Sequence, residues 1–250
     1  MIWTYATQRH AFRRLVDHAG RIAAARRIRT GLVAGTLVAG TLVAVSGLLV
    51  TRVRGTEPSA APRKGRFEIR VVDAKTGLPI AANLFLRNAR GVAVKAPGQP
   101  FWHDHFAFPG SVQLELSPGR YTFEMERGPE YKVRSGEFVI ESGATDGTEV
   151  SLERFVDMKE EGWWSGDLHI HRPPAEIPLL MLAQDLHMAP VITWWNENNA
   201  WKDQALPDPA VIQFDNDRYY ALLAGEDERG GGALLYFNLA SPLPLVAGTE

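Results

Sequence analysis

An uncharged apolar run near the N-terminus constrains this chain more than any other feature. Residues 31–50 read GLVAGTLVAGTLVAVSGLLV and contain no Asp, Glu, Lys or Arg. At about 1.5 Å per residue, a helix of this length crosses a hydrocarbon core of roughly 30 Å. The run therefore predicts a transmembrane helix that acts as a signal-anchor. One alternative is a cleaved secretory signal, whose apolar core is about 7–15 residues long. Another is a buried helix of a soluble domain, which usually shows a polar face.

Arginines on the two sides of this run predict its orientation. Four of them precede it closely, at positions 21, 26, 27 and 29, and two follow it, at positions 52 and 54. Cytoplasmic flanks of membrane helices carry the excess of basic residues, so the basic segment 1–30 is expected to be cytoplasmic. We therefore expect a single-pass membrane protein, in contact with lipid, whose C-terminal part is extracytoplasmic.

The composition limits partners and chemistry. The formal net charge is −2, whereas nucleic-acid-binding domains usually carry a basic excess on one face, so no nucleic-acid partner is expected. The chain has no cysteine, which excludes disulfides, thiolate nucleophiles and Cys-ligated zinc. Any bound metal must be held by His, Asp or Glu.

A region rich in strand patterns follows a linker. Residues 51–65 end in GTEPSAAPRKG and have no apolar period, which is typical of an exposed linker. In the next run, RFEIRVVDA, a period of two puts Phe67, Ile69 and Val71 on one face. Similar runs, separated by turn signals, are ANLFLRN, SVQLELSPGRYTFEME, GEFVIES and EVSLERF. These patterns predict an all-β sandwich over residues 66–156.

This region resembles the carboxypeptidase-regulatory-like (transthyretin-like) module. VVDAKTGLPIAANLFL is similar to its opening strands, and LSPGRYTFEME carries its Pro-Gly-x-Tyr turn. The resemblance implies a fold and no chemistry. Within the region, FWHDHF would place His103 and His105 on one strand face. The alternatives there are a metal or ligand site and a polar edge, and a lone His-x-His supplies too few ligands for a metal.

A second His-x-His pair lies in GWWSGDLHIHRPP, residues 162–174. If this segment is a strand, Asp167, His169 and His171 share one face. Zinc, manganese and iron accept neutral imidazole beside carboxylate, so the face is a candidate metal site. Asp167 is expected to be a ligand or to fix an imidazole tautomer from outside the coordination shell. The alternative is a polar patch on a strand.

The following segments offer further ligands. Glu176 comes five residues after His171, and Glu226 ends the strand-like run YYALLAGE. Between them, residues 177–187 predict a helix and VITWW predicts a buried strand. In such an α/β unit, ligands gather at the carboxyl ends of the strands, where the region of Asn196 is also expected.

GDLHIH, Glu176, HMAPVIT and the later AGE together resemble the polymerase-and-histidinol-phosphatase (PHP) metallohydrolase superfamily, in its carbaryl-hydrolase-like branch. The resemblance implies the first part of a distorted α/β barrel over residues 157–250. It also implies hydrolysis of phosphoester, ester or amide bonds by a metal-activated water. His169 and His171 match the family's first His-x-His pair, Glu176 stands at its first aspartate, and Glu226 matches its bridging glutamate. The implied cofactors are divalent ions of zinc, manganese or iron, in a number that the sequence leaves open.

After VIT the chain departs from this family, because Trp194-Trp195 stands before Asn196 where the resemblance implies Asp-His. His187 and Asp185 are candidate replacements in a rearranged site. The two tryptophans can form an aromatic wall for a substrate or fill the core.

The chain is expected to be a fragment, because residues 157–250 supply less than half of the roughly 200 residues of such a barrel. Two functions are consistent with these patterns. The first function, towards which the sequence leans, is a membrane-anchored, outward-facing metal-dependent hydrolase of a small-molecule or surface substrate. The alternative is a non-catalytic ligand-binding surface protein with a degenerate metallohydrolase-like domain.

Overall fold

The computed structural model describes residues 61–243, which belong to one compact unit, Glu57–Glu250. The first strands are β1 (Gly65–Asp73), β2 (Ala82–Asn88), β3 (Phe101–Trp102), β4 (His105–Phe108), β5 (Ser111–Leu116), β6 (Gly119–Glu126), β7 (Arg134–Ile140) and β8 (Thr145–Leu152). They are followed by the 3-10 helices η1 (Met158–Glu161) and η2 (Pro174–Glu176), helix α2 (Ile177–Gln184), and strands β9 (Met188–Trp195), β10 (Asn198–Asn199), β11 (Val211–Gln213), β12 (Tyr219–Asp227) and β13 (Leu234–Tyr236).

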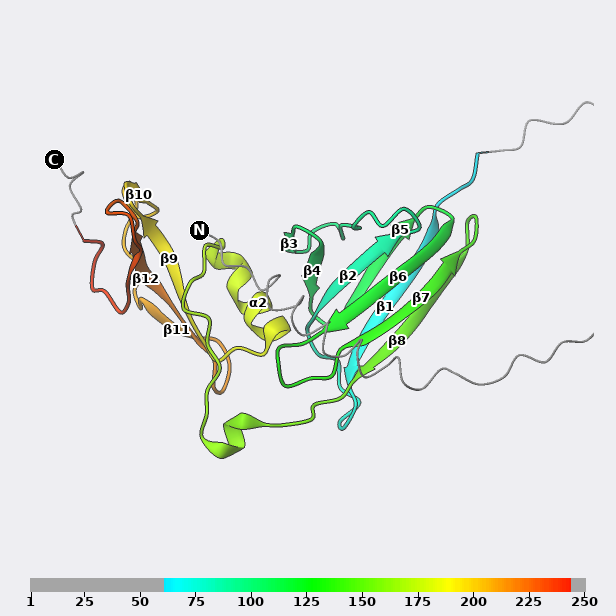
Figure 1. Cartoon of the computed structure of the whole chain (residues 1–250), viewed down its shortest axis with the longest axis horizontal. Helices are drawn as coiled ribbons and strands as arrows, with labels where there is room; N and C mark the ends of the chain where they lie inside the picture. Colours follow the sequence, from blue (N-terminus) through cyan, green and yellow to red (C-terminus); the bar gives the residue numbers. More distant parts are fainter. Residues whose placement is uncertain (1–60, 244–250) are drawn as a thin grey trace, which may run out of the picture. The chain divides into compact units, whose positions relative to one another are not determined.

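Strands β1 to β8 form two sheets around one apolar core (Figure 1). Their orders are β5-β1-β8 and β3-β4-β2-β6-β7, and β1 and β8 pair in parallel. Alternation along β1 buries Phe67, Ile69 and Val71, which belong to this core. The period of two in the sequence therefore selects the face on which the two sheets meet.

Strands β9 to β13 form a third, mixed sheet. Strands β9 and β12 run in parallel side by side, whereas β11 and β13 pair antiparallel with β12 (Figure 1). Gly166 and Ile170 form isolated parallel bridges to Met188 and Val191 of β9. The segment expected to be a strand before His171 therefore bonds to β9 through isolated bridges and forms no continuous strand.

Helix α2 has apolar residues on more than one side, and these residues pack against two different parts of the fold. Ile177 and Met181 belong to the apolar cluster of the third sheet. Ala183 packs against Ala81 and Ala107, which belong to the two-sheet part. A helix without a polar face is expected where it is buried between layers.

The predicted fold class, with its partial α/β barrel, is wrong. The described residues are mostly β, and α2 is the one α-helix among them. Residues 196–218, which connect β9 to β12, form no helix, because they are rich in Asn, Asp and Pro, which favour turns. The antiparallel pairing of β11 and β13 further makes this sheet mixed, so no repeated βα unit arises.

The predicted membrane topology is also corrected. Its span, residues 31–50, lies outside the described residues. Within 61–243 no helix is long and apolar enough to cross a membrane, and the eight residues of α2 reach about 12 Å of the roughly 30 Å required. The single-pass protein with a signal-anchor and an extracytoplasmic C-terminal part therefore has no support in the structure.

Candidate metal centre

Two imidazoles and one carboxylate converge beside the carboxyl end of β12. His169 and His171 flank Ile170, whose bridge to Val191 places both histidines next to β9. Glu226 reaches them from β12, the parallel neighbour of β9. The two histidine Nε2 atoms are 3.2 Å apart, and the ligand atoms of the three residues lie within 4.8 Å of one another.

Glu226 is the buried member of this cluster, with 1% of its surface exposed. Its Oε2 atom lies 2.7 Å from His171 Nε2, at hydrogen-bond geometry. Its Oε1 atom lies 3.0 Å from His169 Nε2, but the alignment is not that of a hydrogen bond, and Oε1 has no such partner among the described residues. An unsatisfied buried acceptor costs about 1–3 kcal/mol. The imidazoles are 44% and 38% exposed, so the open side of the cluster faces solvent.

Asn196 holds the strand end that carries the carboxylate. It follows β9 in a left-handed conformation, with φ of 50°, which Asn tolerates better than most residues. Its backbone N–H donates to the carbonyl oxygen of Glu226, and its side-chain oxygen accepts from the N–H of Glu228 at 2.8 Å. The predicted site residue Asn196 thus supports the backbone beside the cluster.

The two tryptophans have different environments. Trp194 is buried and its ring lies 5.5 Å from that of Tyr236. Trp195 is exposed, its ring lies 5.2 Å from that of His171, and its Nε1–H donates to Glu228 at 2.9 Å. Trp194 therefore fills the core, while Trp195 forms an aromatic wall beside one imidazole.

Two predicted acids are engaged elsewhere. Asp167 accepts a hydrogen bond from the backbone N–H of His169 at 3.0 Å, which closes a local turn. Glu176 forms an ion pair with Arg172 at 2.5 Å, although the contact lacks hydrogen-bond alignment. Neither belongs to the group of three ligand atoms.

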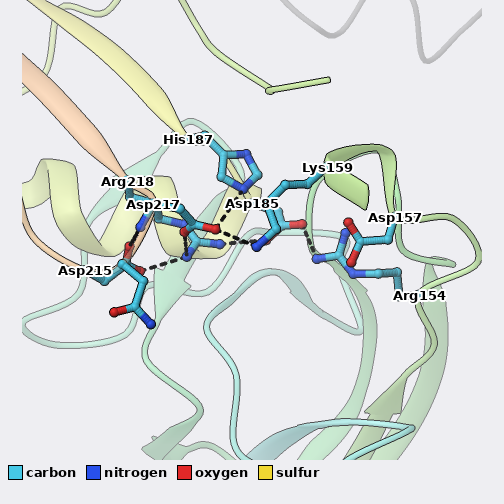
Figure 2. Close-up of a pocket in the computed structure, with 9 residues that line it drawn as sticks. Arg154, Asp157, Lys159, Asp185, His187, Asp215, Asp217 and Arg218 are labelled. Atoms are coloured by element: carbon cyan, nitrogen blue, oxygen red, sulfur yellow. Dashed lines mark hydrogen bonds and ion pairs between the residues drawn. The ribbon is translucent and has the colours of Figure 1, made fainter. Parts of the chain in front are cut away.

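His187 and Asp185 line a separate cavity of about 300 Å³ (Figure 2). Asp185 is buried and paired with three guanidinium groups, those of Arg127 and Arg218 at 3.0 Å and that of Arg154. Burial alone would raise the pKa of Asp185, but the three arginines outweigh it and hold the pKa below its usual value. No local sequence pattern points to these arginines, because they come from distant segments and no short spacing connects them.

The FWHDHF segment does not present its histidines on one strand face. Strand β3 ends at Trp102, and His103 has a left-handed backbone with φ of 50°, so a turn separates it from His105. His105 lies 3.1 Å from Asp104, which pairs with Arg87 at 2.7 Å. The period of two fails here because the hairpin turn lies between the two histidines.

Comparisons with known proteins give only partial likenesses. No family model and no curated protein matches the chain. Among solved structures, it is similar to the Bacillus anthracis TIE protein, with 23% identity and a TM-score of 0.28 over 37% of this chain and 17% of that one. It is similar to GBS52, the minor pilin of Streptococcus agalactiae, with 18% identity and a TM-score of 0.31 over 38% and 47%. The pilus-presented adhesin Spy0125 (Cpa) gives 13% identity and a TM-score of 0.25 over 37% and 27%. The chain thus spans less than half of each of these proteins.

The predicted families and the hydrolase function are corrected accordingly. No family model matches, and the described residues form no α/β barrel on which the PHP ligand set could be arranged. The membrane-anchored PHP hydrolase, and the carboxypeptidase-regulatory-like assignment with it, are therefore wrong. The alternative, a non-catalytic binding protein, agrees better with this β-rich chain.

Proposed function

We propose that this chain is a non-catalytic ligand-binding protein whose binding site is a divalent metal ion held by His169, His171 and Glu226. The observation that carries the proposal is the buried carboxylate, whose two oxygens each lie within 3.0 Å of an exposed imidazole while Oε1 accepts no hydrogen bond among the described residues. Two neutral imidazoles and one carboxylate form a donor set suited to zinc, and also to manganese or iron.

A metal ion resolves a conflict among these three groups. Without one, each Nε2 atom faces a Glu226 oxygen that can only accept, so each needs a proton. The two Nε2 atoms are only 3.2 Å apart, and two N–H groups that close oppose each other. A divalent cation would accept a lone pair from both nitrogens and balance the charge of Glu226. It would also provide a partner for the buried Oε1 atom.

The ligand would bind at the exposed side of the ion. Three protein donors leave at least one position of a tetrahedral zinc ion open, and the exposed imidazoles direct that position to solvent. Trp195 offers a flat apolar surface next to it. The expected ligand thus combines a carboxylate or imidazole donor with an apolar group.

Non-catalytic binding is favoured by the bonds of the neighbouring polar groups. Asp167 accepts from a backbone N–H, and Glu228 accepts from Trp195 Nε1. These acids stabilise the loops around the cluster, and neither lies in the group of three ligand atoms.

Metal titration of the full chain tests this proposal. Zinc should bind at one site per chain, and at 100 times its dissociation constant it should raise the melting temperature by roughly 5–10 °C. His171→Ala should weaken zinc binding more than about 100-fold, beyond the effect usual for groups outside the coordination shell. His103→Asn, which changes an exposed histidine at a left-handed position, is the matched control and should bind like wild type.

Two outcomes would contradict the proposal. If His171→Ala keeps wild-type affinity, the cluster is a polar patch. If the zinc-loaded chain hydrolyses a nitrophenyl ester or phosphoester at a rate that falls in His171→Ala, the site is catalytic.

A further inference from the structure

The hydrogen bonds of Ser165 determine the tautomer of His187. Ser165 Oγ donates to the carbonyl oxygen of Asp185 at 2.7 Å, and it also lies 2.9 Å from His187 Nδ1. A serine hydroxyl has one proton, which the carbonyl receives because it can only accept. The bond to His187 therefore runs from Nδ1–H to Oγ. Neutral His187 carries its proton on Nδ1, which leaves Nε2 as an acceptor.

Among the described residues, that acceptor has no hydrogen-bond donor. The His187 residue is 7% exposed, and its Nε2 atom lies 3.9 Å from Asp217 Oδ2. This distance is too long for a hydrogen bond, and Asp217 offers an acceptor. Burial and then Arg218 lower the pKa of His187, which favours the neutral ring. In Figure 2 the ring points toward the charged groups of the cavity.

The charged donors of this cavity are paired, apart from Arg218 Nε, which has no hydrogen-bond partner among the described residues and almost no exposed surface. Its three cations are each paired with carboxylates, Lys159 with Asp217, Arg218 with Asp215 and Asp185, and Arg154 with Asp185 and Glu130. Four carboxylates line the same space. Among the described residues, Asp157 is the one of these four that makes no ion pair within 4.0 Å. The acceptors left open to a ligand are His187 Nε2 and the Asp157 carboxylate, and the lining residue Asn216 adds an amide that can both donate and accept.

We propose that this cavity binds a small organic cation with at least two N–H donors, a primary ammonium or a guanidinium group. His187 Nε2 and Asp217 Oδ2, two acceptors 3.9 Å apart, suit such a group, because one ligand nitrogen about 2.9 Å from each atom can donate to both. Asp157 supplies a carboxylate that forms no ion pair within 4.0 Å among the described residues. A cavity of about 300 Å³ lies at the small end of ligand sites. The proposal is independent of the metal centre, which involves other residues.

Titration of the full chain with propylammonium chloride, followed by long-range ¹H–¹⁵N spectra of the histidine rings, tests both the tautomer of His187 and the binding of the cation. At pH 7 the His187 ring should carry its proton on Nδ1. Propylammonium should shift its Nε2 resonance saturably, whereas tetramethylammonium, which has the same charge and no N–H, should not. Asp157→Asn should weaken binding about tenfold, as expected for a lost charged hydrogen bond. Asp203→Asn, an exposed acid outside the cavity, is the control.

Ser165→Ala provides a second variant that leaves the ring in place. Without the hydroxyl acceptor, the proton should move to Nε2, which would then no longer accept from the cation, so propylammonium should bind less well. A wild-type ring protonated on Nε2 would overturn the proposal. Equal effects of the two ammonium ions, or unchanged binding by Asp157→Asn, would do the same.

Discussion

Asp185 and Glu226 carry the two most deeply buried carboxylates among the described residues, and their partners differ in charge. Asp185 meets guanidinium groups, which are always charged and compensate it fully. Glu226 meets two imidazoles and keeps one oxygen without a hydrogen bond. The first arrangement stabilises the fold, whereas the second leaves room for a cation.

Replacing Asp185 by Asn should destabilise the protein by about 3–5 kcal/mol, because Arg127 would keep a buried charge without a counter-ion. Arg154 and Arg218 would each lose one of their carboxylate partners. Asp203→Asn should stay within about 0.5 kcal/mol of wild type. Urea unfolding at neutral pH measures both. If Asp185→Asn lowers the free energy of unfolding as little as the control does, the ion pairs between Asp185 and the arginines contribute little to stability.

The same substitution should change the acid limb of the stability curve. Because the folded pKa of Asp185 lies below the ordinary value, its contribution is complete above the unfolded pKa of about 3.9 and is lost as pH falls through the folded pKa. Wild-type stability should thus fall below about pH 4 more steeply than that of Asp185→Asn. Unfolding measured from pH 7 to pH 3 gives this comparison.

Strands β9 and β12 depend on one glycine for their close packing. Trp194 of β9 lies over Gly225 of β12, and a Cβ atom at position 225 would overlap the six-membered ring of Trp194. Gly225 directly precedes Glu226. Because Gly225 has no side chain, β12 can lie close to Trp194, and this close packing sets the position of the buried Glu226 carboxylate.

Gly225→Ala should destabilise the chain by about 1–3 kcal/mol through overpacking, and should also weaken zinc binding by displacing Glu226. Adding Trp194→Leu should relieve the overlap, so the double variant should be more stable than the sum of the single effects. Urea unfolding of the four chains measures this coupling. Additivity within about 0.5 kcal/mol would show that the two positions do not interact.

At the scale of the whole described chain, α2 and Asp185 connect the two-sheet part with the third sheet. Asp185 follows α2 directly. It pairs with Arg127 and Arg154, which precede it in the sequence, and with Arg218, which follows it. Arg127 also donates to the carbonyl oxygen of Ala81 at 2.7 Å. These bonds join segments more than 30 residues apart, so we expect the parts to unfold together.

Two optical probes can test this coupling. Far-ultraviolet circular dichroism reports mainly on the strands of the two-sheet part. Tryptophan fluorescence reports mainly on the later residues, which contain Trp163, Trp164, Trp194, Trp195 and Trp201. The two melting curves should coincide in wild type and separate in Asp185→Asn. Separate wild-type midpoints would show that the two parts fold independently.

Local patterns explain which parts of this fold were accessible from sequence. Alternation in RFEIRVVDA predicts the buried face of β1, and the structure has that face in the core. Local alternation could not show whether the later residues form an α/β barrel. That depends on how β9 and β12 are connected and on which strands pair with β12. The membrane span stays outside the described residues.

Neighbours along the backbone control the alternation of the strands and the His-x-His spacing that brings two imidazoles together, and composition excludes thiol ligands; these features can be read from the amino-acid order. The acid that meets the two imidazoles becomes known only from the folded chain. Glu176 is near in sequence but pairs with Arg172, whereas Glu226, 55 residues after His171, reaches the imidazoles from a neighbouring strand. The physical reason is that side-chain direction follows local backbone period, while burial and charge pairing follow strand order, which short patterns do not specify.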